Sequence, residues 1–359
     1  MQMQCFKIIN KINHIQKGNK IMKTRLLSIA LVAILLFSMV SCDFLKNKNE
    51  DPNTETPTIN VYTLNGTTGF GMAKLMNDAK AGTTTEKYNF SVQTDASNVT
   101  AALLNGSADI AALPTNAAAN IYNKSEGGVV VLAVNTLGCL YLLTNQNETV
   151  TSFEDLRGKT VYVPAQNPTF IFTYLCKQNG LKVGEDITIN SSTYAQPAAL
   201  KDAVASGLVD IAVLPEPMVT IATNTAKNAE NGPTLTTAMD LTAEWNKVAP
   251  KDSLVQGCVV VRRAFLESYP EAVENFLKEY KASIEYLSTD RDSAAQMIVD
   301  NGIFTSAPVA KKALPNCNVC FLDGAAMKSA MQTYLGILFG IAPASVGNKL
   351  PADDFYYAK

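Results

Sequence analysis

Short polar turns hold the residues of this 359-residue chain whose types and spacing suit binding chemistry. The first turn, Asn65-Gly66-Thr67-Thr68-Gly69, follows a β-branched segment and precedes a helical pattern. Glycine lets the backbone approach a bound molecule, and the free N–H groups at a helix start favour an anion or a polar oxygen. The alternative is a turn that only caps its helix with the Thr67 hydroxyl.

Polar residues also follow the other predicted strands. Asn116 carries two donors and one acceptor, so it could orient an amide, a carboxylate or a ring nitrogen. Ionised Glu216 only accepts and would suit an amino group or ring N–H; otherwise it is an exposed residue between two turn prolines. The candidate ligand-binding residues lie in these turns, on the expected hinge side and on one aromatic ring: Asn65, Gly66, Thr67, Thr68, Gly69, Thr94, Thr115, Asn116, Gly138, Gln166, Asn167, Thr169, Tyr194 and Glu216.

The sequence disfavours catalysis. Its one histidine, His14, lies in a leader that is predicted to be removed, so neither a Ser–His nor a Cys–His couple can form. Cys317-Asn-Val-Cys320 is a single pair, whereas zinc would need a second one; a local disulfide or free buried thiols are the remaining options. The carboxylates show no acid/base pair. We therefore expect no catalytic residue, no metal and no cofactor.

Two further patterns narrow the ligand class. Residues 66–71 lack the Gly-x-Gly-x-x-Gly order that dinucleotides need. After the leader, the arginines are Arg157, Arg262, Arg263 and Arg291, and none lies in a predicted strand-end turn. Bidentate recognition of a sulfonate or phosphate by arginine is therefore disfavoured, and a neutral, zwitterionic or weakly anionic solute fits better.

An internal repeat positions these turns. Residues 102–114 recur as residues 203–215, and both copies share a Gly-x-x-Asp-Ile-Ala-x-Leu-Pro pattern. The chain thus contains one strand–helix module twice. Because open α/β sheets bind ligands beyond the carboxyl ends of their strands, two facing modules predict a clamp around a cleft.

Hydrophobic periodicity predicts an α/β fold with two hinged lobes, each a mostly parallel sheet flanked by helices. The expected strands are 58–64, 88–94, 109–113, 129–143 with a break at Gly138, 160–163, 187–191, 210–214 and 254–262. The expected helices are 67–79, 97–104, 168–179, 198–205, one opened by a capping box at 268–271, 291–301, 306–314 and 324–339.

The front of the chain predicts export. Cationic residues precede an apolar run, 26–39, that is too short to span a bilayer, and Cys42 follows a small residue. Residues 1–41 read as a signal peptide with its start at Met22, and Cys42 reads as the lipidated residue of a bacterial lipobox. An ordinary signal peptide with an incidental cysteine is the alternative. Residues 42–57 are polar and predict a flexible tether.

Removing the leader leaves 24 basic and 32 acidic residues, a net charge of −8. This charge disfavours nucleic acid and anionic lipid as partners, so membrane attachment is expected through the lipid alone. Lobe 1 is predicted to comprise 58–147 and 256–359, and lobe 2 to comprise 148–255. The crossings between lobes are expected near 145–149 and 252–256.

Several motifs resemble bacterial solute-binding lipoproteins of ATP-binding-cassette (ABC) importers with the type II periplasmic-binding-protein fold. They are the repeated Gly-x-x-Asp-Ile-Ala, the Leu-Pro-Glu-Pro ending at Pro217, the segment Ser152–Lys159, the segment Asp240–Trp245 and the segment Lys349–Tyr356. The nitrate, alkanesulfonate and thiamine-pyrimidine-precursor branch is the most similar. The resemblance covers the chain from Thr58 onward and does not specify the solute.

The resemblance implies a monomeric receptor, anchored by lipid at the outer side of the cell membrane, facing the periplasm or the cell exterior. It would capture a small polar solute between its lobes and deliver it to an ABC permease with a separate ATPase subunit. A lipoprotein of the same fold that senses or scaffolds is the alternative. Thiamine-pyrimidine synthases share the fold, but they need a histidine and a dense cysteine cluster that this sequence lacks.

Overall fold

The computed structural model describes residues 57–358. The predicted signal peptide, the lipidation site Cys42 and all of the predicted tether except Pro57 lie outside the described residues. The first strand, β1, begins at Thr58, where the sequence predicts the fold to start. Among the described helices, none is long and apolar enough to cross a membrane.

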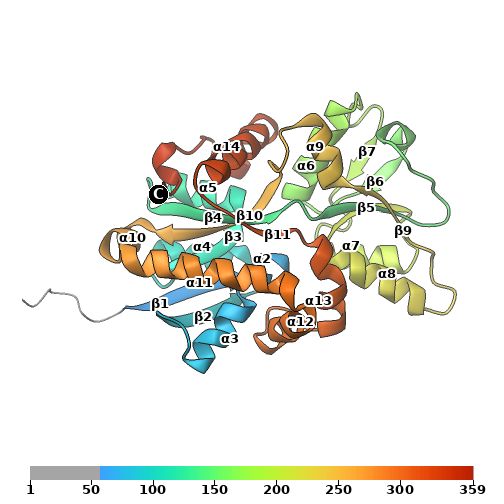
Figure 1. Cartoon of the computed structure of the whole chain (residues 1–359). Helices are drawn as coiled ribbons and strands as arrows, with labels where there is room; N and C mark the ends of the chain where they lie inside the picture. Colours follow the sequence, from blue (N-terminus) through green and yellow to red (C-terminus); the bar gives the residue numbers. More distant parts are fainter. Residues whose placement is uncertain (1–56, 359) are drawn as a thin grey trace, which may run out of the picture. The chain divides into compact units, whose positions relative to one another are not determined.

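Two mixed sheets form the framework (Figure 1). The first has the strand order β11-β4-β10-β3-β1-β2, and the second has the order β7-β6-β8-β5-β9. The strands of the first sheet are β1 (Thr58–Leu64), β2 (Lys87–Gln93), β3 (Ile110–Pro114), β4 (Val129–Leu137), β10 (Val255–Arg262) and β11 (Val319–Leu322). Those of the second are β5 (Leu140–Thr144), β6 (Thr160–Tyr162), β7 (Thr188–Asn190), β8 (Ile211–Pro215) and β9 (Thr236–Asp240).

The duplicated modules are visible in the strand pairing. In the first sheet β1 pairs in parallel with β2 and β3, and in the second β6 pairs in parallel with β7 and β8. One strand runs antiparallel beside each repeat strand: β10 beside β3 and β5 beside β8. The two sheets, with the helices that cover them, are the first and second lobes.

Helices cover both faces of each sheet. The helices are α2 (Thr67–Phe70), α3 (Ala73–Ala81), α4 (Ala96–Asn105), α5 (Thr115–Lys124), α6 (Asn167–Gln178), α7 (Pro197–Ala205), α8 (Met218–Asn228), α9 (Leu241–Val248), α10 (Arg263–Ser268), α11 (Pro270–Thr289), α12 (Arg291–Asp300), α13 (Ala307–Ala313) and α14 (Gly324–Ile341), with short 3-10 turns η1 (Phe153–Leu156), η2 (Leu314–Asn316), η3 (Pro343–Val346) and η4 (Asp353–Phe355). Figure 1 shows α11 across one face of the first sheet, and α6 and α9 opposite α7 and α8 on the second.

Side-chain alternation explains this layering. Along β3, Ile110 and Ala112 join the core under α3 and α11, whereas Ala111 and Leu113 join the core under α4, α5 and α14. All four are fully buried. A central strand covered on both faces is apolar at every position, which is why β3 and β8 read as continuous hydrophobic runs.

The chain crosses from the first sheet to the second at Gly138, where the sequence predicts a break between two strands. A Cβ atom at Gly138 would lie 2.4 Å from both Leu254 Cδ2 and Thr242 Oγ1, so a larger residue there would require these side chains to move. This change of sheet comes before the crossing expected near 145–149, because β5 pairs with β8. The return lies between β9 and β10, and the lobe boundaries themselves stay a prediction.

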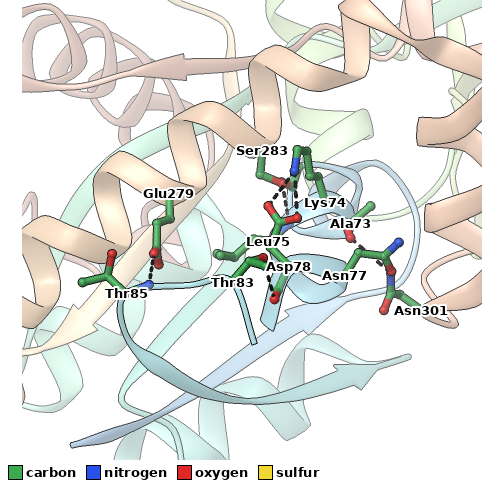
Figure 2. A network of polar contacts seen from close by, with 11 residues as sticks. Ala73, Lys74, Leu75, Asn77, Asp78, Thr83, Thr85, Glu279, Ser283 and Asn301 are labelled. Atoms are coloured by element: carbon green, nitrogen blue, oxygen red, sulfur yellow. Dashed lines mark hydrogen bonds and ion pairs between the residues drawn. The ribbon is translucent and has the colours of Figure 1, made fainter. Parts of the chain in front are cut away.

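The helix expected at 67–79 is broken at Gly71 and Met72, and a polar network holds the break. Ser283 of α11 donates to Gly71 O at 2.6 Å and accepts from Leu75 N at 3.0 Å, so it replaces the helical bonds lost there. Figure 2 shows Ser283 next to Leu75, and at the other side of the same network Asn301, which donates to Ala73 O at 3.1 Å. The break between α2 and α3 is thus held by α11, and the start of α3 by the end of α12.

Other local expectations differ from the structure. The capping box at 268–271 is wrong: Ser268 ends α10 and donates to Ala264 O, and α11 begins at Pro270 without a side-chain cap. Three helices that directly follow strands, α5, α8 and α10, were not predicted, and neither were strand β11 and the β9–α9 segment. Pro114 and Pro217 directly precede α5 and α8, and a proline after a strand reads as a turn.

Candidate functional site

The first turn joins the lobes through Thr67. Gly66 has a φ of +81°, a left-handed conformation that suits glycine, and its N–H donates to Ile303 O at 2.9 Å. Thr67 does not cap α2; its hydroxyl donates to Glu216 O of the second lobe at 2.9 Å and lies 3.7 Å from Cys317 Sγ. Because Thr67 is 8% exposed, this contact is buried. The turn therefore holds the two lobes together in this structure.

Asn116 and Asn167 form a second contact between the lobes. Asn167 begins α6, and its Nδ2 donates to Asn116 Oδ1 in the first turn of α5 at 2.7 Å. Asn116 Nδ2 donates in turn to Ser345 O of η3 at 3.3 Å. Asn167 Oδ1 is buried and, among the described residues, has no hydrogen-bond partner. Both Asn116 and Asn167 were predicted as binding residues from the sequence, and in the structure their side chains are hydrogen-bonded to each other.

Three other candidates have internal partners. Thr115 is fully buried and donates to Val255 O at 2.7 Å, which ties α5 to β10. Thr169 donates to Pro164 O at 2.8 Å within its own turn. A Cβ atom at Gly69 would lie 2.2 Å from Leu64 O, so this glycine allows the chain to fold closely onto β1. These contacts shape the turns.

Glu216 is buried, so the alternative of an exposed residue between prolines is wrong. Its Oε2 accepts from Thr220 N at 3.1 Å, and its Oε1 accepts from Thr220 Oγ1 at 3.0 Å, so the carboxylate faces its own helix α8. Burial raises the pKa of Glu216, and the Thr220 hydrogen bonds oppose that rise. The backbone carbonyl of Glu216 makes the contact to the first lobe.

The remaining candidates are spread along the same edges. Thr94 is exposed beyond β2, and Asn65 is exposed beyond β1, with its N–H on Gln93 O. Thr68 O accepts from Asn135 Nδ2 at 3.2 Å. Tyr194 is half-buried against Tyr162, with ring centroids 5.8 Å apart. Solute contact by any of the candidates stays a prediction.

The cysteines of the described part of the chain have the features of structural thiols. The five described cysteines are free, as expected for structural thiols, and no local disulfide joins Cys317 to Cys320. Burial raises the pKa of Cys139 and Cys320 to about 12, so both thiols are protonated at neutral pH. Among residues 57–358, no group of three histidines, cysteines or carboxylates is arranged to hold a metal ion.

A groove of about 720 Å³ opens beside the Asn116 contact. The facing sides of α4 and α5 line it, together with Gln166, Phe170 and η3. Sequence reasoning placed Asn116 and Gln166 in the site but missed Asn120, Ile121 and Ser345. Asn120 and Ile121 lie four residues after Asn116 and Ala117, so they share a helix face with them. This spacing could have revealed them, but helix α5 was not predicted.

A family model described as "ABC transporter, phosphonate, periplasmic substrate-binding protein" matches residues 71–304. The chain belongs to this family. It is thus a substrate-binding component of an ABC import system and not an enzyme, which confirms the expectation from the sequence. A search of curated proteins gave no significant match.

Solved structures of transport proteins share the fold. An ABC transporter protein from Parabacteroides distasonis is 23% identical over 85% of this chain and 100% of its own, with a TM-score of 0.69. The aliphatic sulphonate-binding protein SsuA of Escherichia coli is 15% identical over 84% and 92%, with a TM-score of 0.66. The nitrate-binding protein NrtA of Synechocystis is 15% identical over 81% and 83%, with a TM-score of 0.57. The predicted two-lobe α/β fold is thereby confirmed.

Proposed function

We propose that the chain is an exported lipoprotein, anchored through Cys42, that captures a small polar solute between its lobes and hands it to an ABC permease. The family supports the import role, and its extracytoplasmic location agrees with the signal-peptide pattern. The lipid anchor rests on the position of Cys42 after the apolar run. We keep the predicted lobe boundaries except for β5, which the prediction put in the first lobe. We assign β5 to the second lobe because it pairs with β8.

The observation that carries the proposal is the convergence of strand-end residues from both sheets. The loop after β1 meets the loop after β8 through Thr67 and Glu216, and the start of α5 meets the start of α6 through Asn116 and Asn167. Both contacts lie at the carboxyl ends of strands, where α/β sheets bind ligands. A solute placed there would contact both lobes at once.

The proposed mechanism is hinge closure. The chain changes sheet at Gly138, and the segment before β11 lies along this crossing: Leu137 N donates to Asn318 O at 3.0 Å, and Tyr141 Oη donates to Asn316 O at 2.9 Å. Rotation at such a crossing opens and closes the lobes, and a solute that bridges them favours the closed form. The closed form would then dock on the permease.

Replacing Asn116 tests the site. Asn116→Ala removes two polar atoms at the lobe contact, and one lost hydrogen bond corresponds to about tenfold weaker binding. A thermal-shift screen of sulfonates, nitrate, pyrimidines, amino acids and bicarbonate supplies the solute, and calorimetry then measures its affinity. Asn228→Ala, an exposed amide at the end of α8, is the control. Equal affinity in both variants would exclude this site.

Two cellular measurements test the rest. A Cys42→Ser variant should lose incorporation of an alkynyl fatty acid and leave the membrane fraction; retained labelling would refute the anchor. Deleting the gene should abolish uptake of the solute that binds in vitro. Normal uptake would favour the sensing or scaffolding lipoprotein instead.

A further inference from the structure

The groove beside Asn116 has two chemically different ends. Because β2 and β3 lie on opposite sides of β1 and parallel to it, α4 and α5 return in the same direction. Ser97, Thr100 and Asn116 therefore lie at one end, and Leu104 and Lys124 lie at the other. Lys124 lies seven residue steps along α5 from Ala117, which corresponds to about 10 Å. The groove suits an elongated molecule.

Asn167, whose neighbour Gln166 lines the first end, contains a buried acceptor without a hydrogen-bond donor among the described residues. This acceptor is Asn167 Oδ1, while Nδ2 of the same side chain donates to Asn116 Oδ1. An unmade hydrogen bond at a buried acceptor costs about 1–3 kcal/mol, so an N–H or O–H of a bound molecule would stabilise this atom. Gln166, which lines the groove, has a φ of +67°. A strained residue of this kind persists where the surroundings enforce it, often at a ligand site.

The walls between the two ends are mostly apolar. Ala101 and Leu104 of α4 face Ala117 and Ile121 of α5, and Leu104 is 50% exposed. Lys124, which is exposed, is the one charged side chain among the described lining residues. A phosphonate or sulfonate head at the Asn116 end would therefore meet no charged side chain among the described lining residues, and only N–H groups and neutral side chains could replace its hydration.

We propose that this groove binds an elongated, uncharged organic solute. Its hydrogen-bond donors reach the Asn116–Asn167 contact, and its apolar stem lies between α4 and α5. The inference rests on the proposed function, because the Asn116–Asn167 contact must open and close with the hinge to admit the donor. It narrows the substrate to a class that differs from the phosphonate in the family's description.

Ligands with one stem and different heads test this class. Calorimetry on the protein without its leader would compare hexanamide, hexylphosphonate and hexanesulfonate. We expect saturable binding of hexanamide with a Kd at least tenfold below those of the two anions. Tighter binding of either anion, or no saturable binding of hexanamide, would overturn the inference. If one of the anions binds and Asn116→Ala lowers its affinity, the proposed receptor function is supported and only the proposed solute class is wrong.

A filled groove tests the location. Ala101 is exposed in the middle of α4, so Ala101→Trp blocks the groove without disturbing the core. It should weaken hexanamide at least tenfold, whereas Ala199→Trp, at an exposed position of the repeat helix α7, should leave the affinity unchanged. Unchanged affinity in Ala101→Trp would refute the groove. Loss of cellular uptake with normal hexanamide binding would also refute it and would indicate a permease contact.

Discussion

The two copies of the repeat end in the same Leu-Pro step but use it differently. After β3, Pro114 leads directly into α5, and Asn116 presents its side-chain amide to the other lobe. After β8, the side chain of Glu216 turns back onto α8, and its backbone carbonyl meets Thr67. The repeated strand-end segment thus contacts the other lobe through a side chain after β3 and through a backbone carbonyl after β8.

A second pair of repeat residues diverges in burial. Asp109, 5% exposed, accepts from Arg262 Nη2 at 2.6 Å and from Asn60 N at 3.0 Å. Asp210 is exposed and accepts from Asn145 Nδ2 at 2.5 Å. The same residue type at the same repeat position is therefore a buried ion-pair partner in one lobe and a surface acceptor in the other. Duplication preserves the fold more strictly than the interactions.

The largest expected effect comes from the turns that follow the first strand of each module. Gly69→Ala would place a Cβ 2.2 Å from a backbone oxygen and force the chain apart, at a cost of about 3 kcal/mol. Thr169→Ala, in the corresponding turn, loses one hydrogen bond worth about 1 kcal/mol. Urea unfolding would compare them. Equal losses would show that the two turns are equivalent after all.

The paired aspartates should differ next. Asp109→Ala leaves the guanidinium of Arg262 partly buried without its carboxylate, and we expect a loss of about 2 kcal/mol. Asp210→Ala removes an exposed acceptor and should cost less than about 1 kcal/mol. Urea unfolding of both variants would give their free energies of unfolding. A larger loss of stability for Asp210→Ala than for Asp109→Ala would contradict the prediction.

A smaller effect is expected at the main-chain contact between the lobes. Thr67→Val keeps the shape and removes the hydroxyl, so the bond to Glu216 O is lost for about 1 kcal/mol. Thr83→Val, where the hydroxyl bonds an exposed carbonyl at 3.1 Å, is the control. Thermal unfolding of both variants would measure the difference in stability between them. A Thr67→Val protein as stable as the control would show that the contact is weak.

The pH dependence should expose the buried Glu216. Burial raises its pKa in the folded state above the value of about 4.3 in an unfolded chain, so ionisation destabilises the fold as pH rises. Glu216→Gln should therefore raise the melting temperature at pH 7 and have little effect at pH 4. Exposed Glu185→Gln is the control. An equal shift at both pH values would contradict the burial argument.

Periodicity predicted the regular parts of the molecule well. The strand at 58–64 matches β1, and the helices at 168–179 and 198–205 match α6 and α7 within one residue. Prediction failed at α5 and α8, which begin directly after the strand-end prolines Pro114 and Pro217, because Pro-Thr-Asn and Pro-Glu-Pro read as turns that end the strands. It also failed at Gly71, where the break depends on Ser283 from a distant helix.

The sequence by itself determined the family, the two modules and the side chains at their strand ends, because these depend on local pattern and repetition. Tertiary structure decided which of those side chains meet: Asn116 meets Asn167, whereas the Glu216 carboxylate stays with Thr220. It also decided that β5 belongs to the second sheet and that a groove runs between α4 and α5. These outcomes depend on contacts between residues far apart in the chain, which no local pattern encodes.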